Sequence, residues 1–236
     1  SLKVDFVGHP LVDESRRAWQ EPEAPLPWPG EPRVALLPGS RGHVVRHILP
    51  AMWRAAGLLE KTQAGVGFVI AAPSAEMEAV VKKTVAPLSG GPARWTVVTG
   101  HTRQVLRQAR AAMVASGTAT IEAALMHCPM IVVYRMAPLS YLLGKWLISL
   151  DQIGMVNIVA GKPVCPEFIQ GAATPPALAQ AVAPLLRDSP ERVRMVEELK
   201  RVTAALGPGG AADRAAESVL EELTTGYLAT SLTRSG

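Results

Sequence analysis

Residues 33–61 read RVALLPGSRGHVVRHILPAMWRAAGLLEK, and they contain one complete strand-and-helix unit. After Arg33, the opening run VALLPG is continuously apolar rather than alternating, which indicates a strand buried on both faces. A turn with proline and glycine follows, and the rest of the stretch presents an apolar stripe at helical spacing. The stretch therefore predicts a strand, a tight turn and a long helix.

The same alternation recurs along the chain. Further apolar runs bounded by turn residues follow at residues 67–73, 95–100, 111–116 and 129–135. Helical stretches occupy the intervals between them, and alternating strands and helices are typical of a parallel sheet covered on both faces. We expect an α/β fold: a Rossmann-like, doubly wound parallel sheet over residues 33–173, followed by C-terminal helices over residues 174–225.

The two ends of the chain lack this alternation. Residues 1–32 include the proline-rich run QEPEAPLPWPGEP and predict an exposed linker or interdomain segment. The first residues, SLKVDFVGHP, have the pattern of a strand already under way, so we expect the chain to begin inside a longer protein. Ser189 with Pro190 indicates a helix start, and residues 226–236 predict a flexible tail.

Composition limits the function classes open to the chain. Of its 236 residues, 48% are hydrophobic and 19% are charged, which is enough for a sizeable core and argues against disorder. The net charge of +4 favours anionic partners, such as phosphates or an acidic membrane surface, but lacks the clustered basicity of a nucleic-acid binder. No run of about eighteen apolar residues is present that could span a bilayer, and no signal peptide is visible. Cys128 and Cys165 stand apart in apolar settings and predict buried thiols in a reducing cytoplasm.

The first unusual strand end is LLPGSRG, residues 36–42. A glycine lets backbone amides approach a phosphate closely, a helix N-terminus adds partial positive charge, and an arginine can bind two phosphate oxygens at once. The stretch matches neither GxGxxG nor a P-loop. Gly39, Ser40 and Arg41 therefore form either an anion site or a tight turn with a solvated arginine.

The second unusual strand end is VASGTATIEAAL, residues 114–125. Ser116, Gly117 and Thr118 close a strand and open a helix, so a second set of amides and hydroxyls can meet an anion. Glu122 lies about one turn into that helix, where a capping box with Thr118 would need the acid at position 121. The carboxylate contributes either about 0.3–1 kcal/mol through the helix dipole or hydrogen-bond acceptors for a ribose diol. Two anion-type loops and one acid fit a sugar nucleotide better than a free phosphate.

Two further features leave alternatives open. Asn157, Glu167 and Gln170 either line the same cleft as Glu122 or serve local capping. Residues 130–150, MIVVYRMAPLSYLLGKWLISL, place leucines and a tryptophan at helical spacing after a strand. That helix either faces the core or offers a greasy, partly exposed surface for acyl chains or a membrane interface.

Five blocks of sequence occur in a distinctive order: FVGHPLVD, LLPGSRGHVV, ASGTATIEAAL, CPMIVVYRM and NIVAGKPVCPEFIQ. In order and rough spacing they resemble lipid-A-disaccharide synthase, a bacterial GT-B glycosyltransferase, over about residues 4–187. The resemblance implies transfer of 2,3-diacylglucosamine from its UDP derivative onto lipid X, the corresponding 1-phosphate. A β-1′,6-linked disaccharide forms and UDP leaves.

GT-B enzymes have two Rossmann-like halves, and this chain resembles the second, nucleotide-binding half. The resemblance carries a set of UDP-binding residues onto this chain: Gly39, Ser40, Arg41, Ser116, Gly117, Thr118, Glu122, Asn157, Glu167 and Gln170. Tyr134 and Arg135 match the family pattern without receiving a role. No cofactor and no metal are implied, because helix amides and Arg41 take the charge that develops on the leaving diphosphate.

The family's first half, which would carry the catalytic base, has no counterpart in this sequence. We therefore expect no catalytic residue in this chain, and nucleotide binding with little or no transfer when the chain is alone. Exposed apolar surface and a swapped or tight homodimer are further expectations. The implied partners are UDP-2,3-diacylglucosamine, lipid X and the inner membrane surface, with a cytoplasmic, peripheral location and no nucleic acid.

Two other functions remain as alternatives. One is a UDP-N-acetylglucosamine 2-epimerase-like enzyme or a peptidoglycan-type transferase on the same scaffold, against which GHPLVD and the NIVAG and PEFIQ runs argue. The other is a non-catalytic module that binds a sugar nucleotide or assembles with a partner.

Overall fold

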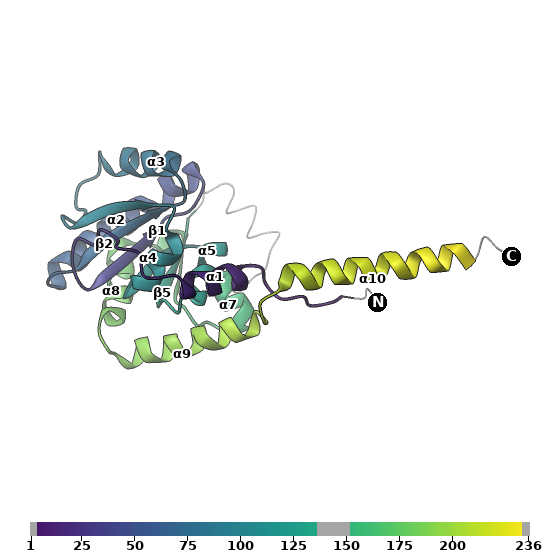
Figure 1. Ribbon diagram of the computed structural model, residues 1–236. Coiled ribbons are helices and arrows are strands. Elements are labelled where there is room, and N and C mark those ends of the chain that lie inside the picture. The colour runs from purple at the N-terminus through teal and green to yellow at the C-terminus, as the bar shows by residue number, and fades with distance from the viewer. Residues whose placement is uncertain (1–3, 136–151, 233–236) are drawn as a thin grey trace.

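The computed structural model describes residues 4–135 and 152–232, with side chains described as far as residue 224. Its centre is a single parallel sheet (Figure 1), and the strands are β1 (Arg33–Leu37), β2 (Gly67–Ala72), β3 (Trp95–Thr99), β4 (Ala111–Ala115), β5 (Met130–Tyr134) and β6 (Glu167–Ile169). Their order is β3-β2-β1-β4-β5-β6, and every neighbouring pair is parallel. The prediction of a doubly wound parallel sheet is confirmed. The chain reverses its winding direction between β1 and β4, where such sheets bind ligands.

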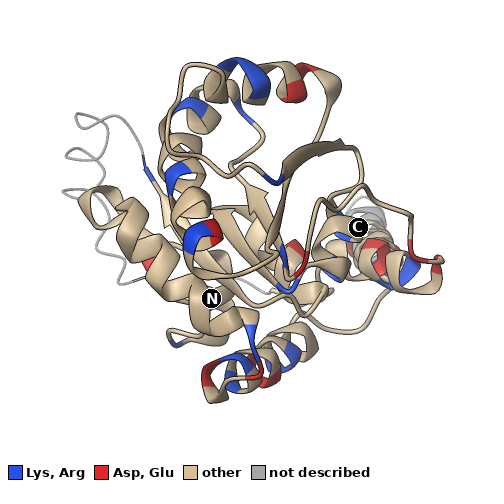
Figure 2. Cartoon of the chain, turned by 90° about the vertical axis from the view of Figure 1, so that its left-hand side faces the viewer, with Lys and Arg blue, Asp and Glu red and all other residues tan. Residues whose placement is uncertain are grey.

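Helices cover both faces of this sheet (Figure 1). On one face α2 (Gly42–Thr62) packs between α3 (Ala75–Val85) and α8 (Pro175–Val182). On the other face lie α4 (Thr102–Gln108) and α5 (Thr118–Leu125), and packed against α5 are α1 (Leu11–Gln20), α7 (Met155–Ala160) and α9 (Pro190–Ala205). This double cover explains the continuous apolar strands, because β2 and β4 are buried along their whole length. Charged residues follow the outer helices and loops, while most of the sheet lacks them (Figure 2).

The C-terminal helices begin where the sequence indicated. Pro175 opens α8 after an N-cap threonine, and Pro190 opens α9 after Ser189, whose hydroxyl accepts the Arg192 amide at 3.1 Å. Because α8 packs on α2, β4 and β5, it belongs to the layer that covers the sheet. Two short 3₁₀ helices, Gln170–Ala172 and Ala183–Leu186, connect these elements.

The last helix, α10 (Ala211–Leu232), projects from the body of the molecule (Figure 1). It extends through part of the segment expected to be a flexible tail, residues 226–236. The helix expected between residue 135 and residue 150 lies outside the described residues. None of the helices in the described part of the chain combines the length and the apolarity that a bilayer crossing requires.

The N-terminal segment differs from the exposed linker that its prolines predict. Residues 4–9 form no strand, and residues 11–20 form helix α1, with Val12 and Ala18 buried against the domain. The apolar positions of LVDESRRAWQ fall on one helical face, a signal that the neighbouring proline-rich run obscures.

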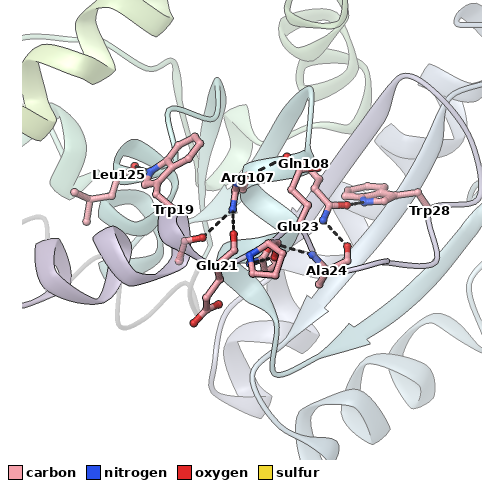
Figure 3. Close-up of polar contacts among 11 residues, drawn as sticks. Trp19, Glu21, Glu23, Ala24, Trp28, Arg107, Gln108 and Leu125 are labelled. Carbon is pink, nitrogen blue, oxygen red and sulfur yellow. Dashed lines mark hydrogen bonds and ion pairs between the residues drawn. The ribbon is translucent and has the colours of Figure 1, made fainter.

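The proline-rich run itself is tied to α4 (Figure 3). Arg107 donates to the carbonyls of Ala18 and Glu21 at 2.9 and 2.8 Å, and Gln108 donates to the carbonyl of Ala24 at 2.7 Å. Backbone carbonyls in the last turn of a helix or outside regular structure still need donors, and long polar side chains more than eighty residues away supply them here. Sequence patterns report local periodicity, so they could not reveal this docking.

Candidate functional site

The two unusual strand ends meet in one pocket. β1 and β4 are neighbours, with Leu37 opposite Val114, so the loops that follow them lie side by side at the carboxyl edge of the sheet. The pocket has a volume of about 400 Å³, within the range of about 300–1,000 Å³ that is usual for small-molecule sites. Its lining includes seven of the residues that the sequence singled out: Gly39, Ser40, Arg41, Ser116, Gly117, Thr118 and Glu122.

The first loop is shaped by Gly39. Its φ of +115° lies in the region that favours glycine, and a Cβ there would meet Val44 Cγ1 at 2.9 Å. Arg41 occupies the N-cap position of α2 in an extended conformation, and no side chain caps the helix. The first amides of α2 are therefore available to an anion in the pocket, and the exposed Arg41 guanidinium lines the same space.

The second loop repeats this arrangement at α5. Gly117 is the N-cap residue with a φ of +143°, and no side chain caps this helix either. Ser116 differs from the expectation that its amide and hydroxyl meet an anion. Its hydroxyl donates to the Ile153 carbonyl at 2.9 Å, and its amide donates to the Val133 carbonyl at 3.0 Å. Ser116 therefore fastens the loop to residues 152–154. The Thr120 amide already donates to the Gly117 carbonyl at 3.1 Å, so the first two amides of α5 are the ones left for a ligand.

Glu122 forms the acidic wall of the pocket. Its Oε1 atom lies 3.1 Å from Arg103 Nη2, and only 20% of its side chain is exposed. Burial raises the pKa of the Glu122 carboxyl above its ordinary value; the Arg103 guanidinium opposes this rise, and the Glu14 carboxylate adds to it. The side chain is thus a partly buried acid that is held by one cation.

Asn157 and Glu167 lie outside the lining of this pocket and form an internal network. Asn157 Oδ1 accepts the amides of Val164 and Cys165, each at 2.9 Å, and its Nδ2 donates to Glu167 Oε1 at 2.7 Å. The Glu167 carboxylate also accepts the amides of residues 153 and 154 at 2.8 and 2.9 Å. The network braces the segment to which Ser116 is fastened, which corresponds to the capping alternative left open by the sequence.

Gln170 is also absent from the pocket lining. It has a φ of +50° and opens the 3₁₀ helix after β6, where its carbonyl accepts a hydrogen bond from Arg135 Nε at 3.2 Å. Roles for Asn157, Glu167 and Gln170 in nucleotide binding therefore remain predictions.

The pocket lining also includes residues that the sequence pattern did not indicate. Pro73 and Thr102 follow β2 and β3 at the same edge of the sheet, and the apolar wall comes from Leu37, Val44, Ala71, Ala115, Ala119 and Met155. The strand-end rule could have found Pro73 and Thr102, but neither carries a charge or a motif. The described residues contain no group of three His, Cys, Asp or Glu side chains placed to hold one metal ion.

Comparisons with known proteins show the family to which the chain belongs. The family model described as lipid-A-disaccharide synthetase matches residues 1–220. The lipid-A-disaccharide synthase of Syntrophus aciditrophicus is 41% identical over 222 residues, which are 93% of this chain and 57% of the relative. That of Myxococcus xanthus is 37% identical over 196 residues, which are 83% of this chain and 50% of the relative. The chain thus spans about half the length of the curated relatives it matches.

Solved structures share the fold at low sequence identity. A putative UDP-N-acetylglucosamine 2-epimerase from Listeria monocytogenes superposes with a TM-score of 0.59 at 17% identity, over 94% of this chain and 53% of that one. A spinosyn rhamnosyltransferase complexed with thymidine diphosphate gives 0.54 at 18% identity, over 78% and 45%. These likenesses establish the GT-B-type half and, at such identities, nothing about substrate.

Proposed function

The chain belongs to the lipid-A-disaccharide synthetase family, and from this premise we propose that it is the nucleotide-binding half of a hexosyltransferase. The reaction is transfer of 2,3-diacylglucosamine from its UDP derivative to lipid X, with release of UDP. The observation that carries the proposal is the single pocket in which two uncapped helix N-termini, Arg41 and Glu122 converge.

Each part of the pocket suits one part of UDP. The first amides of α2 and α5 and the Arg41 guanidinium offer hydrogen-bond donors and positive charge to the diphosphate. Glu122 offers a carboxylate to the ribose hydroxyls, and the apolar wall beside Pro73 and Thr102 offers a surface to the base. Donors that are already in place when the glycosidic bond breaks stabilise the negative charge on departing UDP.

The general base and the access to acylated substrates are placed outside this pocket. We place the general base in none of the residues of this chain, so the chain alone binds UDP with little or no transfer. Lipid X and the diacylated donor carry acyl chains, and a peripheral position on the cytoplasmic face of the inner membrane would give the enzyme access to both. The likeness to the 2-epimerase structure concerns the fold, at 17% identity, and supports no second activity.

Calorimetric titration with UDP tests the proposal on the full chain. Arg41→Ala and Glu122→Ala each remove a charged hydrogen-bonding group from the pocket and should weaken UDP binding by about 1–3 kcal/mol. Arg54→Ala on α2 and Glu217→Ala on α10 are matched controls, because both side chains are exposed and away from the pocket lining. Absence of saturable binding, or equal losses in the test and control variants, would contradict the proposal.

A further inference from the structure

We infer that Arg103 is a positioning residue of the ribose site, which holds the Glu122 carboxylate ready to accept the two ribose hydroxyls. The inference rests on the proposed function, because that proposal assigns the ribose to Glu122. It adds a residue that does not line the nucleotide pocket and that belongs to neither of its two loops.

Arg103 contacts Glu122 from outside the nucleotide pocket. A second hollow of about 270 Å³ adjoins the nucleotide pocket, and its lining includes Arg103, Glu14 and Glu122. Glu122 is therefore a wall shared by the two spaces, with Arg103 on the side away from the two phosphate loops. Arg103 follows Thr102 at the start of α4, and Thr102 itself lines the nucleotide pocket.

One guanidinium nitrogen joins two carboxylates. Arg103 Nη2 lies 3.1 Å from Glu122 Oε1 and also bonds Oε2 of Glu14 on helix α1. Helix α1 is itself fixed, since Trp19 Nε1 donates to the Leu125 carbonyl at 3.1 Å. The guanidinium is thus restrained by two acids on separate helices and cannot move freely around Glu122.

This geometry determines which part of the carboxylate a ligand can use. An ionised carboxylate has two oxygens with about four acceptor positions. Arg103 engages Oε1, and the inference places the ribose hydroxyls on Oε2 and on the remaining lone pairs. A half-buried acid also tends to become neutral, and a neutral carboxyl loses acceptor capacity that a diol needs. Arg103 favours the charged form of the Glu122 carboxylate and holds that carboxylate in one orientation.

The test compares UDP with 2′,3′-dideoxy-UDP, which lacks both ribose hydroxyls, in calorimetric titrations of the full chain. The unaltered chain should bind UDP at least about tenfold more tightly than the dideoxy compound, as expected for hydrogen bonds to a charged group. Glu122→Gln and Arg103→Met should each abolish most of this preference while leaving affinity for the dideoxy compound nearly unchanged. Arg103→Lys should restore part of it, because an ammonium keeps the charge but not the planar fork.

Arg54→Met is the matched control, since Arg54 is exposed on α2 and lines neither hollow. If Arg103→Met keeps the preference, or weakens both nucleotides equally, Arg103 does not act through Glu122 and the inference is overturned. If Arg103→Met fails to fold, Arg103→Lys decides: an unchanged preference for UDP overturns the inference, and a reduced preference with unchanged dideoxy affinity supports it.

The titrations separate failure of the proposed function from failure of the role of Arg103. A chain that binds neither nucleotide overturns the proposed function and this inference together. A preference that survives Glu122→Gln places the ribose away from Glu122, which overturns the ribose assignment and the role of Arg103 but leaves nucleotide binding intact. A preference that Glu122→Gln erases and Arg103→Met retains overturns the role of Arg103 alone.

Discussion

At the residue scale, Glu122 combines the charge that our proposal assigns to ribose binding with burial that opposes that charge. Its raised pKa follows mainly from loss of solvent, and the single guanidinium of Arg103 reduces the effect without cancelling it. The charged groups that act on the Glu122 carboxyl are Arg103 from α4 and Glu14 from α1. The protonation state of Glu122 should control both ligand binding and stability as the pH falls through its raised pKa.

Affinity for UDP should fall as the pH drops through the raised pKa of Glu122, because the protonated carboxyl is a poorer acceptor. The free energy of unfolding should change in the opposite sense: the folded state then binds a proton that the unfolded state releases, so this group's contribution to stability rises as pH falls. UDP titrations from about pH 7.5 to pH 5 would measure the first effect. Glu122→Gln provides the reference, because ionisation of the nucleotide itself affects both proteins equally. Parallel pH profiles for the two proteins would contradict the prediction.

Gly39→Ala should lower the free energy of unfolding by about 1–3 kcal/mol, through strain at its positive φ and the approach of the new Cβ to Val44. It should also weaken UDP binding, because the loop must shift to relieve that contact. Urea denaturation and UDP titration measure the two effects. Gly171→Ala is the control, since no heavy atom lies within 4 Å of a Cβ built there. Equal stability of the two variants would show that Gly39 is not conformationally required.

At the element scale, the site depends on where strands end and on how short segments are fastened to them. The sheet places the loops after β1 and β4 together, and the 152–154 segment is joined to the second loop through Ser116. Asn157 and Glu167 fix that segment through their polar atoms. The sequence left this amide and this carboxylate open between cleft lining and local capping, and in this structure both act as internal braces.

Asn157→Ala should lower the free energy of unfolding by about 3 kcal/mol, because it leaves buried amides and the Glu167 carboxylate without their partner. Urea denaturation of this variant beside Gln180→Ala, an exposed amide on α8, would measure the difference. Loss of UDP affinity at full retained stability would instead assign Asn157 a direct role in the pocket.

Most elements and both loops of the pocket could be predicted, because apolar runs, helical stripes and glycine turns are local signals. Helix α1 was missed since prolines follow it directly, and β6 was missed because its three half-buried residues produce no apolar run. Pro73, Thr102 and Arg103 were missed for another reason. Their importance comes from neighbours on other strands and helices, and no local pattern records that.

At the scale of the whole molecule, α10 projects from the body (Figure 1). Val219, Leu220 and Leu223 are exposed on it, and Val4 and Phe6 are exposed in the N-terminal segment. A further hollow lies between that segment and α10, with Val7 and Leu223 in its lining. Contiguous exposed apolar surface of this kind is typical of association sites.

We expect the chain to self-associate through α10, so that Leu220→Glu with Leu223→Glu shifts it toward the monomer. Sedimentation velocity over a range of protein concentrations would measure the shift. Val193→Glu on α9 is the control, because it places the same charge on an exposed apolar position of another helix. A chain that stays monomeric at all concentrations before substitution would contradict the expectation.

The sequence by itself determined the fold class, the strand-end loops and the family, because these depend on periodicity and on motifs that lie together along the chain. Only the tertiary structure decided which polar residues share the pocket. Glu122 lines the pocket, whereas Asn157 and Glu167 do not. The Ser116 hydroxyl is already bonded to the Ile153 carbonyl. Arg103 forms ion pairs with both Glu122 and Glu14. The physical reason is that hydrogen bonds and ion pairs join atoms by distance in space, and folding places residues about twenty to one hundred positions apart within about 3 Å of each other.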